Sequence, residues 1–297
     1  MRILLSGAQG QLGGRLLPLL RQLGEVMAVG RGECDLASPE AIVNVVAQAR
    51  PSVVVNAAAY TAVNEAETHV ELARAINCDA PAVLAREARK LDAMFVHYST
   101  DYVFDGTKRG AYTENDPPAP LNVYGVTKLA GEQAVAAVGG RSLVLRTSWV
   151  YGAGGNNFLL TMRRLARERE ELRVVNDQVG APTSTGQLAS ATVRLIAQLA
   201  AREVAEFPSG VYHATSSGET SWYGFAEAIV AALAPWEPLR VRRVIGIPGS
   251  EYSTPARRPP NSVLSNERFA RTFGFRLESW QAGLTQVIDE LRASEGR

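Results

Sequence analysis

Short apolar runs alternate with longer helical patterns through the first half of the chain, and this alternation constrains the fold more than any other feature. The apolar runs lie at Ile3–Leu5, Val26–Val29, Val53–Val55, Phe95–His97 and Leu143–Leu145. The segments between them carry apolar residues at helical spacing, over Gln11–Leu23, Pro39–Ala49, Val70–Leu91 and Val123–Val138. Parallel strands need such long crossover connections. The pattern predicts an α/β fold with a doubly wound parallel sheet, whose strands are apolar because helices cover both faces.

The sequence changes in texture after about Trp149, where loops rich in Gly, Asn, Pro and Ser become denser. These loops lie at Gly152–Asn157, Gly180–Thr185 and Pro255–Ser262, and helical patterns continue at Asn156–Arg169, Gly186–Ala201, Ser221–Leu233 and Trp280–Arg292. We expect residues 1–150 to form one domain. Residues 151–297 are expected to form mainly a smaller C-terminal substrate-binding lobe, with some segments returning to the first domain. The charged run Arg163–Arg173 is interpreted as a solvated helix face.

Composition argues against several classes of protein. The formal net charge of +1 gives no basic excess, so we expect no nucleic-acid partner. No apolar run approaches the roughly 20 residues that span a bilayer, and the N-terminus is too short for a signal peptide, so we expect no membrane association. Cys34 and Cys78 are too few for a disulfide framework, and with three histidines they form no cluster at metal-ligand spacing. We therefore expect a cytoplasmic protein without a metal.

A glycine loop joins the first predicted strand to the first predicted helix. It reads Gly7-Ala8-Gln9-Gly10-Gln11-Leu12-Gly13. Glycines at such a junction let the backbone turn sharply and approach a pyrophosphate, and the helix N-terminus attracts the anion. The spacing differs by one residue from the common G-x-G-x-x-G fingerprint. The alternative is a plain glycine turn in a protein that binds no dinucleotide, but the strand–turn–helix context favours a Rossmann-type dinucleotide-binding domain.

The end of the second strand indicates which dinucleotide is bound. Folds that prefer NAD usually carry an acidic residue there for the ribose 2′-hydroxyl. Here the strand ends in Val29-Gly30-Arg31, without an acid. Arg31 is suited to a 2′-phosphate, so we expect NADPH, with NADH left open as a second cofactor. The alternative for Arg31 is a surface arginine on a mobile loop.

A tyrosine and a lysine are spaced for proton transfer. Tyr124 and Lys128 stand at i and i+4, so they share a helix face. A nearby ammonium is expected to lower the pKa of the phenol, which helps Tyr124 protonate a carbonyl oxygen as hydride arrives. Thr100 follows the fourth strand, at the sheet edge where open α/β sheets bind ligands, and is placed to polarise the carbonyl. The alternatives are a chance surface pair and a threonine that caps a turn.

Several longer segments carry a resemblance to a known family. They are Val55–Val63, Tyr98–Phe104, Pro120–Gly125, Arg146–Gly152, Asn176–Thr183 and Arg257–Ser262. In these segments the chain resembles the extended short-chain dehydrogenases/reductases and, among them, the dTDP-4-dehydrorhamnose reductase family. The resemblance spans nearly the whole chain, and its later segments belong to the sugar-nucleotide lobe of that family.

The resemblance implies a set of site residues. The catalytic residues would be Thr100, Tyr124 and Lys128. Together with the glycine loop and Arg31, the cofactor site would comprise Gly7, Gly10, Gln11, Leu12, Gly13, Asp35, Leu36, Ala57, Ala58, Tyr60, Asn77, Tyr124 and Lys128. The substrate would contact Thr100, Asp101, Tyr102, Asn122, Trp149, Arg257 and Asn261. A core tryptophan is the alternative for Trp149.

The implied reaction is the NADPH-dependent reduction of the C4 keto group of dTDP-4-dehydro-β-L-rhamnose to dTDP-β-L-rhamnose. Other readings stay open: a reductase of another 4-keto-6-deoxy sugar nucleotide, an epimerase that retains NAD, and a noncatalytic regulatory subunit. Some relatives form a magnesium-bridged dimer through an acidic residue just after the glycine loop. Gly14 and Arg15 stand there in this chain, so the metal is not expected and a homodimer is left open.

Overall fold

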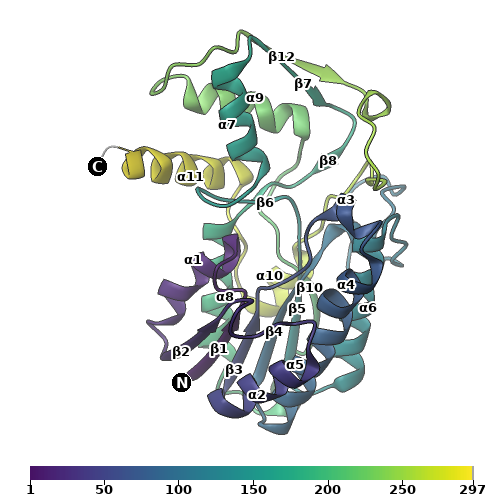
Figure 1. Ribbon diagram of the computed structural model, residues 1–297, viewed down its shortest axis with the longest axis vertical. Helices are drawn as coiled ribbons and strands as arrows, with labels where there is room; N and C mark the ends of the chain where they lie inside the picture. Colours follow the sequence, from purple (N-terminus) through teal and green to yellow (C-terminus); the bar gives the residue numbers. More distant parts are fainter. Residues whose placement is uncertain (296–297) are drawn as a thin grey trace.

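The computed structural model describes residues 1–295, and a parallel sheet of six strands lies at its centre (Figure 1). The strand order is β2-β1-β3-β4-β5-β10, and every neighbouring pair is parallel. The strands are β1 (Arg2–Ser6), β2 (Glu25–Val29), β3 (Val53–Asn56), β4 (Met94–Thr100), β5 (Ser142–Thr147) and β10 (Gly210–His213). The chain moves outward from β1 to β2 and then returns across β1 to β3. This reversal creates a crevice at the carboxyl ends of the strands, where ligands bind in such sheets.

Helices cover both faces of this sheet, because its strands are apolar on both sides. One face packs against α1 (Gln11–Leu20), α8 (Thr185–Leu199) and α10 (Glu267–Phe273). The other face packs against α2 (Pro39–Ala49), α5 (Ala80–Lys90) and α6 (Val123–Val138). Successive residues of β1 divide between the two cores: Ile3 and Leu5 join the first, and Leu4 joins the second. The predicted doubly wound α/β fold is confirmed.

The segment predicted as one helix over Val70–Leu91 is divided by a π-helical turn. It consists of α4 (Val70–Arg74), the π turn Ala75–Asp79 and α5. At this turn α6 approaches so closely that a Cβ atom on Gly131 would lie 2.1 Å from the carbonyl oxygen of Asn77. Such turns insert one residue into a helix, often at functional sites. Here the turn presents Asn77 to the strand ends, beside the short helix α3 (Val63–Ala66).

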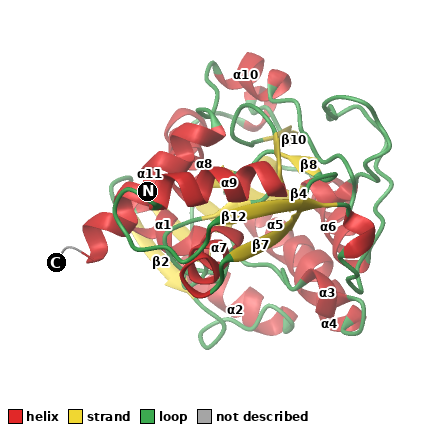
Figure 2. Ribbon diagram, turned by 90° about the horizontal axis from the view of Figure 1, so that it is seen from above, coloured by secondary structure: helices red, strands yellow, loops and turns green. Residues whose placement is uncertain are grey.

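A second group of elements lies beyond the carboxyl ends of the sheet, in the upper part of Figure 1. It comprises α7 (Phe158–Glu168), β7 (Glu171–Val175), α9 (Trp222–Leu233), β12 (Arg243–Ile247) and α11 (Trp280–Glu295), which share an apolar core. Strands β7 and β12 form a parallel pair. Seen from above in Figure 2, α7, α9 and this pair overlie the strands of the sheet. Short pairs join β6 (Val150–Tyr151) to β9 (Thr183–Ser184), and β8 (Val179–Gly180) to β11 (Thr220–Ser221).

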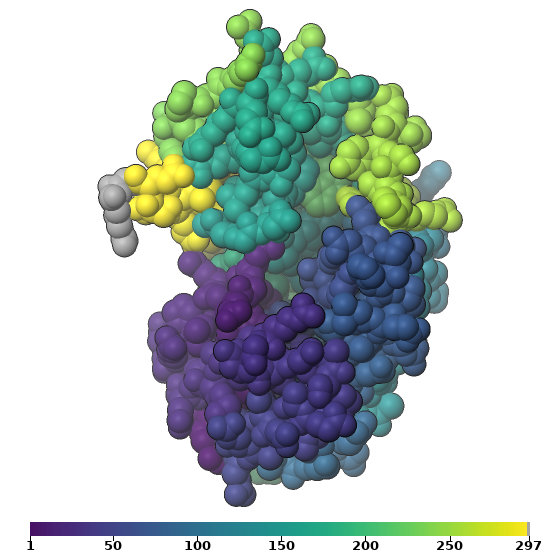
Figure 3. All heavy atoms as spheres, in the orientation of Figure 1, coloured from purple at the N-terminus to yellow at the C-terminus, as the bar shows by residue number. Residues whose placement is uncertain are grey.

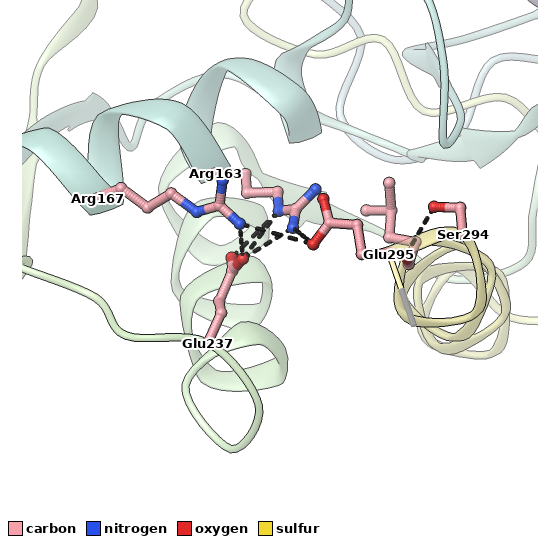
Figure 4. Close-up of polar contacts among 6 residues, drawn as sticks. Arg163, Arg167, Glu237, Ser294 and Glu295 are labelled. Atoms are coloured by element: carbon pink, nitrogen blue, oxygen red, sulfur yellow. Dashed lines mark hydrogen bonds and ion pairs between the residues drawn. The ribbon is translucent and has the colours of Figure 1, made fainter. Parts of the chain in front are cut away.

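The charged run Arg163–Arg173 is not a solvated helix face throughout, so that prediction was wrong. Arg163 is only 7% exposed, and its guanidinium binds both carboxylate oxygens of the equally buried Glu237 at 2.8–3.2 Å. It also donates to Glu295 of α11 at 2.7 Å, while Arg167 joins Glu237 from the next helical turn (Figure 4). The pattern misled because an arginine may be buried wherever carboxylates from other elements pair with it.

None of the helices within residues 1–295 is long and apolar enough to cross a membrane.

Candidate active site

A cavity of about 810 Å³ opens at the carboxyl ends of β1, β3, β4 and β5. The segment from Thr147 to Val150, together with Asn156, closes it on the side of the second group of elements. In Figure 3 the purple and blue atoms of the first hundred residues meet the teal and lime atoms of the later chain across the middle of the molecule. Among the predicted site residues, the cavity is lined by Gly7, Gly10, Gln11, Leu12, Arg31, Asp35, Leu36, Ala57, Ala58, Tyr60, Thr100, Asp101, Tyr124, Lys128 and Trp149.

The glycine loop has the form that a pyrophosphate needs. Gly7 has a φ of +75°, and a Cβ atom there would lie 2.6 Å from the amide nitrogen of Ala58. Gly10 donates its amide to the carbonyl of Gly7 and precedes α1, whose N-terminus has no side-chain cap within the described residues. The amides of the first turn therefore remain available to an anion. Gly13 does not line the cavity: a Cβ there would lie 2.0 Å from the Gly7 carbonyl oxygen, so it sets the packing of helix on loop.

A carboxylate that was not predicted from the sequence lies at the end of β2. Glu33 folds back, and its Oε2 accepts a hydrogen bond of 2.8 Å from the amide of Gly30. Arg31 lines the cavity at the same place and is exposed. A cation and a carboxylate thus both lie at the strand end, although of the two only Arg31 lines the cavity. The signal was missed because the acid follows the strand by four residues and reaches back through a turn.

Tyr60 is held at the cavity wall by Asn77. The Oδ1 of Asn77 accepts from the amide of Tyr60 at 2.9 Å, and its Nδ2 donates to the carbonyl of Tyr60 at 3.1 Å and to Thr127 at 3.2 Å. Asn77 is fully buried and does not line the cavity. The structure therefore places it behind the wall, as the support of a cavity residue.

Thr100, Asp101 and Tyr124 gather at the end of β4. Thr100 is the last residue of the strand rather than a residue beyond it. Its hydroxyl donates to Oδ1 of Asp101 at 2.9 Å and accepts from the amide of Tyr102 at 3.2 Å. It therefore caps a turn, which was the alternative reading, and lines the cavity as well. Burial raises the pKa of Asp101 to about 7, although the nearby hydroxyls of Ser262 and Thr100 oppose this.

The expected lowering of the pKa of Tyr124 by Lys128 is not found. Desolvation by the surrounding protein raises the pKa of Tyr124 above its usual range, the hydroxyl of Thr100 partly offsets this, and Asp101 adds to it. Lys128 has no such effect because it turns toward β4. It donates to the carbonyl of Tyr98 at 2.6 Å and lies 3.3 Å from Nε2 of His97. A raised pKa keeps the phenol protonated, which is the form required of a proton donor.

Two further hydroxyls at this edge were missed by the sequence analysis. The Oγ of Ser99, the Oγ1 of Thr147 and the Oδ2 of Asp101 are buried and have no hydrogen-bond partner within residues 1–295. All three residues line the cavity. Buried polar atoms are nearly always paired, so these three atoms are exceptions to that rule beside the cavity.

Trp149 contributes an aromatic wall. Its ring stacks on Trp222 of α9 at 3.5 Å between centroids, and its backbone has a φ of +46°. A Cβ atom on Gly180 would lie 2.5 Å from the indole, so only glycine fits beneath the ring. Trp149 lines the cavity and belongs to an aromatic stack, so it is both a wall residue and a packing residue.

Four predicted substrate residues do not line the cavity. Tyr102 packs edge-on against Tyr124 at 5.9 Å between ring centroids. Asn122 caps α6 by accepting from the amide of Gly125, and it donates to the carbonyl of Arg257, whose side chain is exposed. Asn261 donates to two carbonyls of the loop at 108–110. Asn122 thus holds the N-terminus of α6, which carries Tyr124, and the side chains of both asparagines are paired with backbone groups.

Within the described residues, no group of three or more His, Cys, Asp or Glu side chains is arranged to hold a metal ion. Arg15, which stands where some relatives carry an acid, pairs with Glu290 of α11.

Comparison with known proteins places this geometry in context. The model of the RmlD substrate binding domain family matches residues 1–293. A dTDP-4-dehydrorhamnose reductase of Burkholderia thailandensis is 50% identical over 98% of this chain and 99% of its own length. The crystal structure of the Clostridium acetobutylicum dTDP-4-dehydrorhamnose reductase superposes with a TM-score of 0.91 at 38% identity, covering 98% of this chain and 100% of that one. The Bacillus anthracis reductase in complex with NADP superposes with a TM-score of 0.89 at 34% identity, covering 97% and 99%.

Proposed function

The chain belongs to the RmlD substrate binding domain family of dTDP-4-dehydrorhamnose reductases, and on this premise we propose how its residues perform that reaction. It is an NAD(P)H-dependent oxidoreductase that reduces the C4 keto group of dTDP-4-dehydro-β-L-rhamnose to give dTDP-β-L-rhamnose, the last step of dTDP-L-rhamnose synthesis. The family favours this reduction over the epimerase and the regulatory subunit that the sequence left open.

The cofactor is NADPH, and when bound it supplies the hydride that reaches C4. The amides of the first turn of α1 would hold its pyrophosphate, because no side chain caps this helix N-terminus. Arg31 would contact a 2′-phosphate, whereas Glu33 would accept from a 2′-hydroxyl. The presence of both groups supports the use of NADH as well as NADPH.

The chemical step is assigned to Tyr124, with Thr100 and Lys128 as its partners. Tyr124 protonates the oxygen at C4 as the hydride arrives, and Thr100 donates a hydrogen bond to the same oxygen. Thr100 would give up its bond to Asp101 to do so, leaving that carboxyl free for a substrate hydroxyl. The observation that carries this proposal is the convergence of Thr100, Tyr124 and Lys128 on one cavity that also contains the glycine loop.

We assign the sugar and nucleotide to the side of the cavity that Trp149 closes. An aromatic ring can pack on the apolar face of a sugar. On this basis residues 1–150 form the dinucleotide-binding domain, and residues 151–297 supply mainly the sugar-nucleotide lobe. The segments α8, β10 and α10 pack on the six-stranded sheet and belong to the first domain. We further propose that the enzyme acts in the cytoplasm, and sedimentation of the purified protein will decide between a monomer and a homodimer.

The first test replaces the proposed proton donor. In Tyr124→Phe we expect kcat to fall by a factor on the order of 10²–10⁴, the usual contribution of a positioned acid. The Kd for NADPH, measured by fluorescence titration, should stay within about twofold, because the ring and its packing on Tyr102 remain. Tyr252→Phe is the control, since Tyr252 is 56% exposed on the other group of elements.

The substrate is tested with a panel of 4-keto-6-deoxy sugar nucleotides, with NADPH consumption followed at 340 nm, the absorption band of reduced nicotinamide. Turnover should be highest with the dTDP-linked L-sugar, and the product should have the configuration of rhamnose at C4. A wild-type protein that consumes no NADPH with any member of the panel, or a fully active Tyr124→Phe variant, contradicts the proposal.

A further inference from the structure

A chain of buried hydrogen bonds runs behind the cavity and ends at Lys128. The hydroxyl of Ser6 donates to Oδ1 of Asn56 at 2.7 Å, and Nδ2 of Asn56 lies 3.1 Å from Nδ1 of His97. On the other side of the ring, Nε2 of His97 lies 3.3 Å from Nζ of Lys128. Each of these side chains is at most 2% exposed. The chain crosses β1, β3 and β4 to reach α6.

The direction of this chain is fixed at Asn56. The amide of Ala58 lies 3.3 Å from Oδ1 of Asn56, and a backbone N–H can only donate. Oδ1 therefore faces Ala58, and the NH₂ group of Asn56 faces His97. Nδ1 of His97 must then accept, so a neutral ring carries its hydrogen on Nε2 and donates toward Lys128.

The surroundings of Lys128 allow the amine to accept that hydrogen. The carbonyl of Tyr98 takes one of its protons at 2.6 Å. The nearest carboxylate along α6 is Glu132, and both of its oxygens are bound by Arg146 of β5 at 2.6–2.9 Å. The ring of Phe95 lies parallel to the ring of His97, with 6.1 Å between the ring centroids. Burial lowers the pKa of Lys128 to about 8, with Glu132 opposing the shift. Burial and then Lys128 hold the pKa of His97 well below its ordinary value, so the ring stays neutral.

We propose that His97 is a positioning residue for Lys128: Asn56 holds it as the Nε2–H tautomer, and its N–H favours the uncharged amine and fixes where the amine lies. A donor that faces Nζ opposes the ammonium form, because two donors repel. Lys128 thereby becomes more acidic than an ordinary lysine.

This property matters for the proton balance of the reaction, so the inference rests on the proposed roles of Tyr124 and Lys128. Each turnover takes one proton from Tyr124, and the phenolate must recover it. Tyr124 and Lys128 line the same cavity, so a protonated Lys128 can return the proton through water in that cavity, as an N–H bond breaks at Nζ and the O–H bond of Tyr124 forms. Lys128 then regains a proton from solvent.

The tautomer can be observed without substrate or cofactor. In a ¹⁵N-labelled protein at pH 9, long-range ¹H–¹⁵N correlation spectra should show His97 as the Nε2–H tautomer. The sequence has three histidines, so His69→Gln and His213→Gln assign the signal of His97 by elimination without touching the chain of hydrogen bonds. An Nδ1–H tautomer in the wild-type protein overturns the proposal.

Asn56→Asp reverses the direction of the chain at nearly constant shape. A carboxylate at this position still accepts from Ser6 and Ala58, but it also accepts from Nδ1–H of His97. Nε2 then becomes an acceptor for the ammonium. We expect the Nδ1–H tautomer in this variant. The titration of Lys128 can be followed through the signals of His97, and we expect its midpoint to rise by about one pH unit.

Turnover should respond in the same sense. Activity is lost as pH rises and Lys128 loses its proton, so in Asn56→Asp the basic limb of the kcat profile should move up by about one pH unit. The KM for the sugar nucleotide should change less than twofold, because Asn56 does not line the cavity. An unchanged basic limb and an unchanged titration midpoint would overturn the proposal.

Thr192→Val is the matched control. Thr192 lies on α8, and its hydroxyl forms a buried hydrogen bond of 2.7 Å with the hydroxyl of Tyr98, which the valine removes. The backbone carbonyl of Tyr98, which binds Lys128, stays in place. The substitution should lower stability without moving the basic limb. The tautomer assay is independent of turnover, so the two proposals can fail separately. If the wild-type protein has no reductase activity but carries Nε2–H at His97, the proposed function is refuted and the proposed hydrogen-bond chain stands.

Discussion

Asp101 shows how one residue carries opposing demands at the edge of the cavity. It is 2% exposed, its Oδ1 accepts from Thr100, and its Oδ2 has no partner within the described residues. A carboxylate in that setting is costly, because burial removes its hydration. Its pKa of about 7 means that the group titrates near neutrality. The burial of Asp101 is thus unfavourable to the stability of the fold whenever the carboxyl group is ionised.

Replacing Asp101 by asparagine should change how the stability of the protein depends on pH. The pKa of Asp101 is higher in the folded protein than the ordinary value of 3.8 for an aspartate, so folding favours the protonated form. The contribution of Asp101 to stability is therefore greatest below pH 4 and declines as pH rises to about 7. Relative to wild type, the free energy of unfolding of the variant should rise over this range by on the order of 2–4 kcal/mol.

Urea unfolding between pH 4.5 and 8 measures this difference. Asp289→Asn serves as the control, because the side chain of Asp289 is 65% exposed. If the curves of wild type and Asp101→Asn stay parallel across the range, Asp101 is not the buried titrating group described here.

At the scale of elements, α7, α9 and α11 are joined by charge as well as by an apolar core. Arg163 and Arg167 of α7 bind Glu237, which follows α9, and Arg163 also binds Glu295 at the end of α11 (Figure 4). The ring of Trp236 packs under the guanidinium of Arg163 at 5.0 Å. When these arginines and glutamates are paired, they fix how the three helices meet. Unpaired, the buried cation would be costly.

Glu237→Ala should therefore destabilise the protein by about 3 kcal/mol, because it leaves the buried guanidinium of Arg163 with only one carboxylate. Glu168→Ala is the control on the same helix: Glu168 pairs with Arg164 at 2.9 Å, but both side chains are more than half exposed. Its effect should be below about 0.5 kcal/mol, the usual value of an exposed pair. Urea unfolding at pH 7 measures both, and equal losses would argue against the role assigned to Glu237.

At the scale of the whole molecule, the cavity lies at a seam between two cores, and few polar contacts cross it. Gln11 of the glycine loop donates to the carbonyl of Asn156 and accepts from Nδ2 of Asn157. The side chain of Asn157 also caps α7 by accepting from the amide of Leu160. Arg15 and Glu290 pair nearby on α1 and α11. One asparagine thus connects the cofactor loop to the start of the other core.

Asn157→Ser separates the two roles of this residue. A serine still caps α7, but it loses the donors that reach Gln11 and the carbonyls of Gly152 and Gly154. We expect NADPH to bind about fivefold more weakly, as loss of the one hydrogen bond to Gln11 implies, and the free energy of unfolding to fall by about 1–3 kcal/mol, because the bonds to two carbonyls are lost as well. Fluorescence titration measures the first and urea unfolding the second. Unchanged affinity would show that the glycine loop does not depend on this contact.

The sequence by itself determined five of the six strands of the sheet, because local pattern is enough to specify them, whereas β10 at the edge was not predicted. Five predicted strands occur at their predicted places, and the glycine loop follows the first of them. The period of the apolar residues marks a buried strand or helix wherever burial follows the chain. The residues Tyr124 and Lys128 share a helix face for the same reason: their spacing is a property of the helix alone.

Only the tertiary structure decided which polar side chains meet. Lys128 turns to His97 and the carbonyl of Tyr98 rather than to Tyr124. Arg163 is buried because Glu237 and Glu295 reach it from segments 74 and 132 residues away. The side-chain amides of Asn122 and Asn261 donate to backbone carbonyls instead of lining the cavity. Such contacts join residues far apart in the chain, and the pattern of one segment contains no information about which distant group will pair with it.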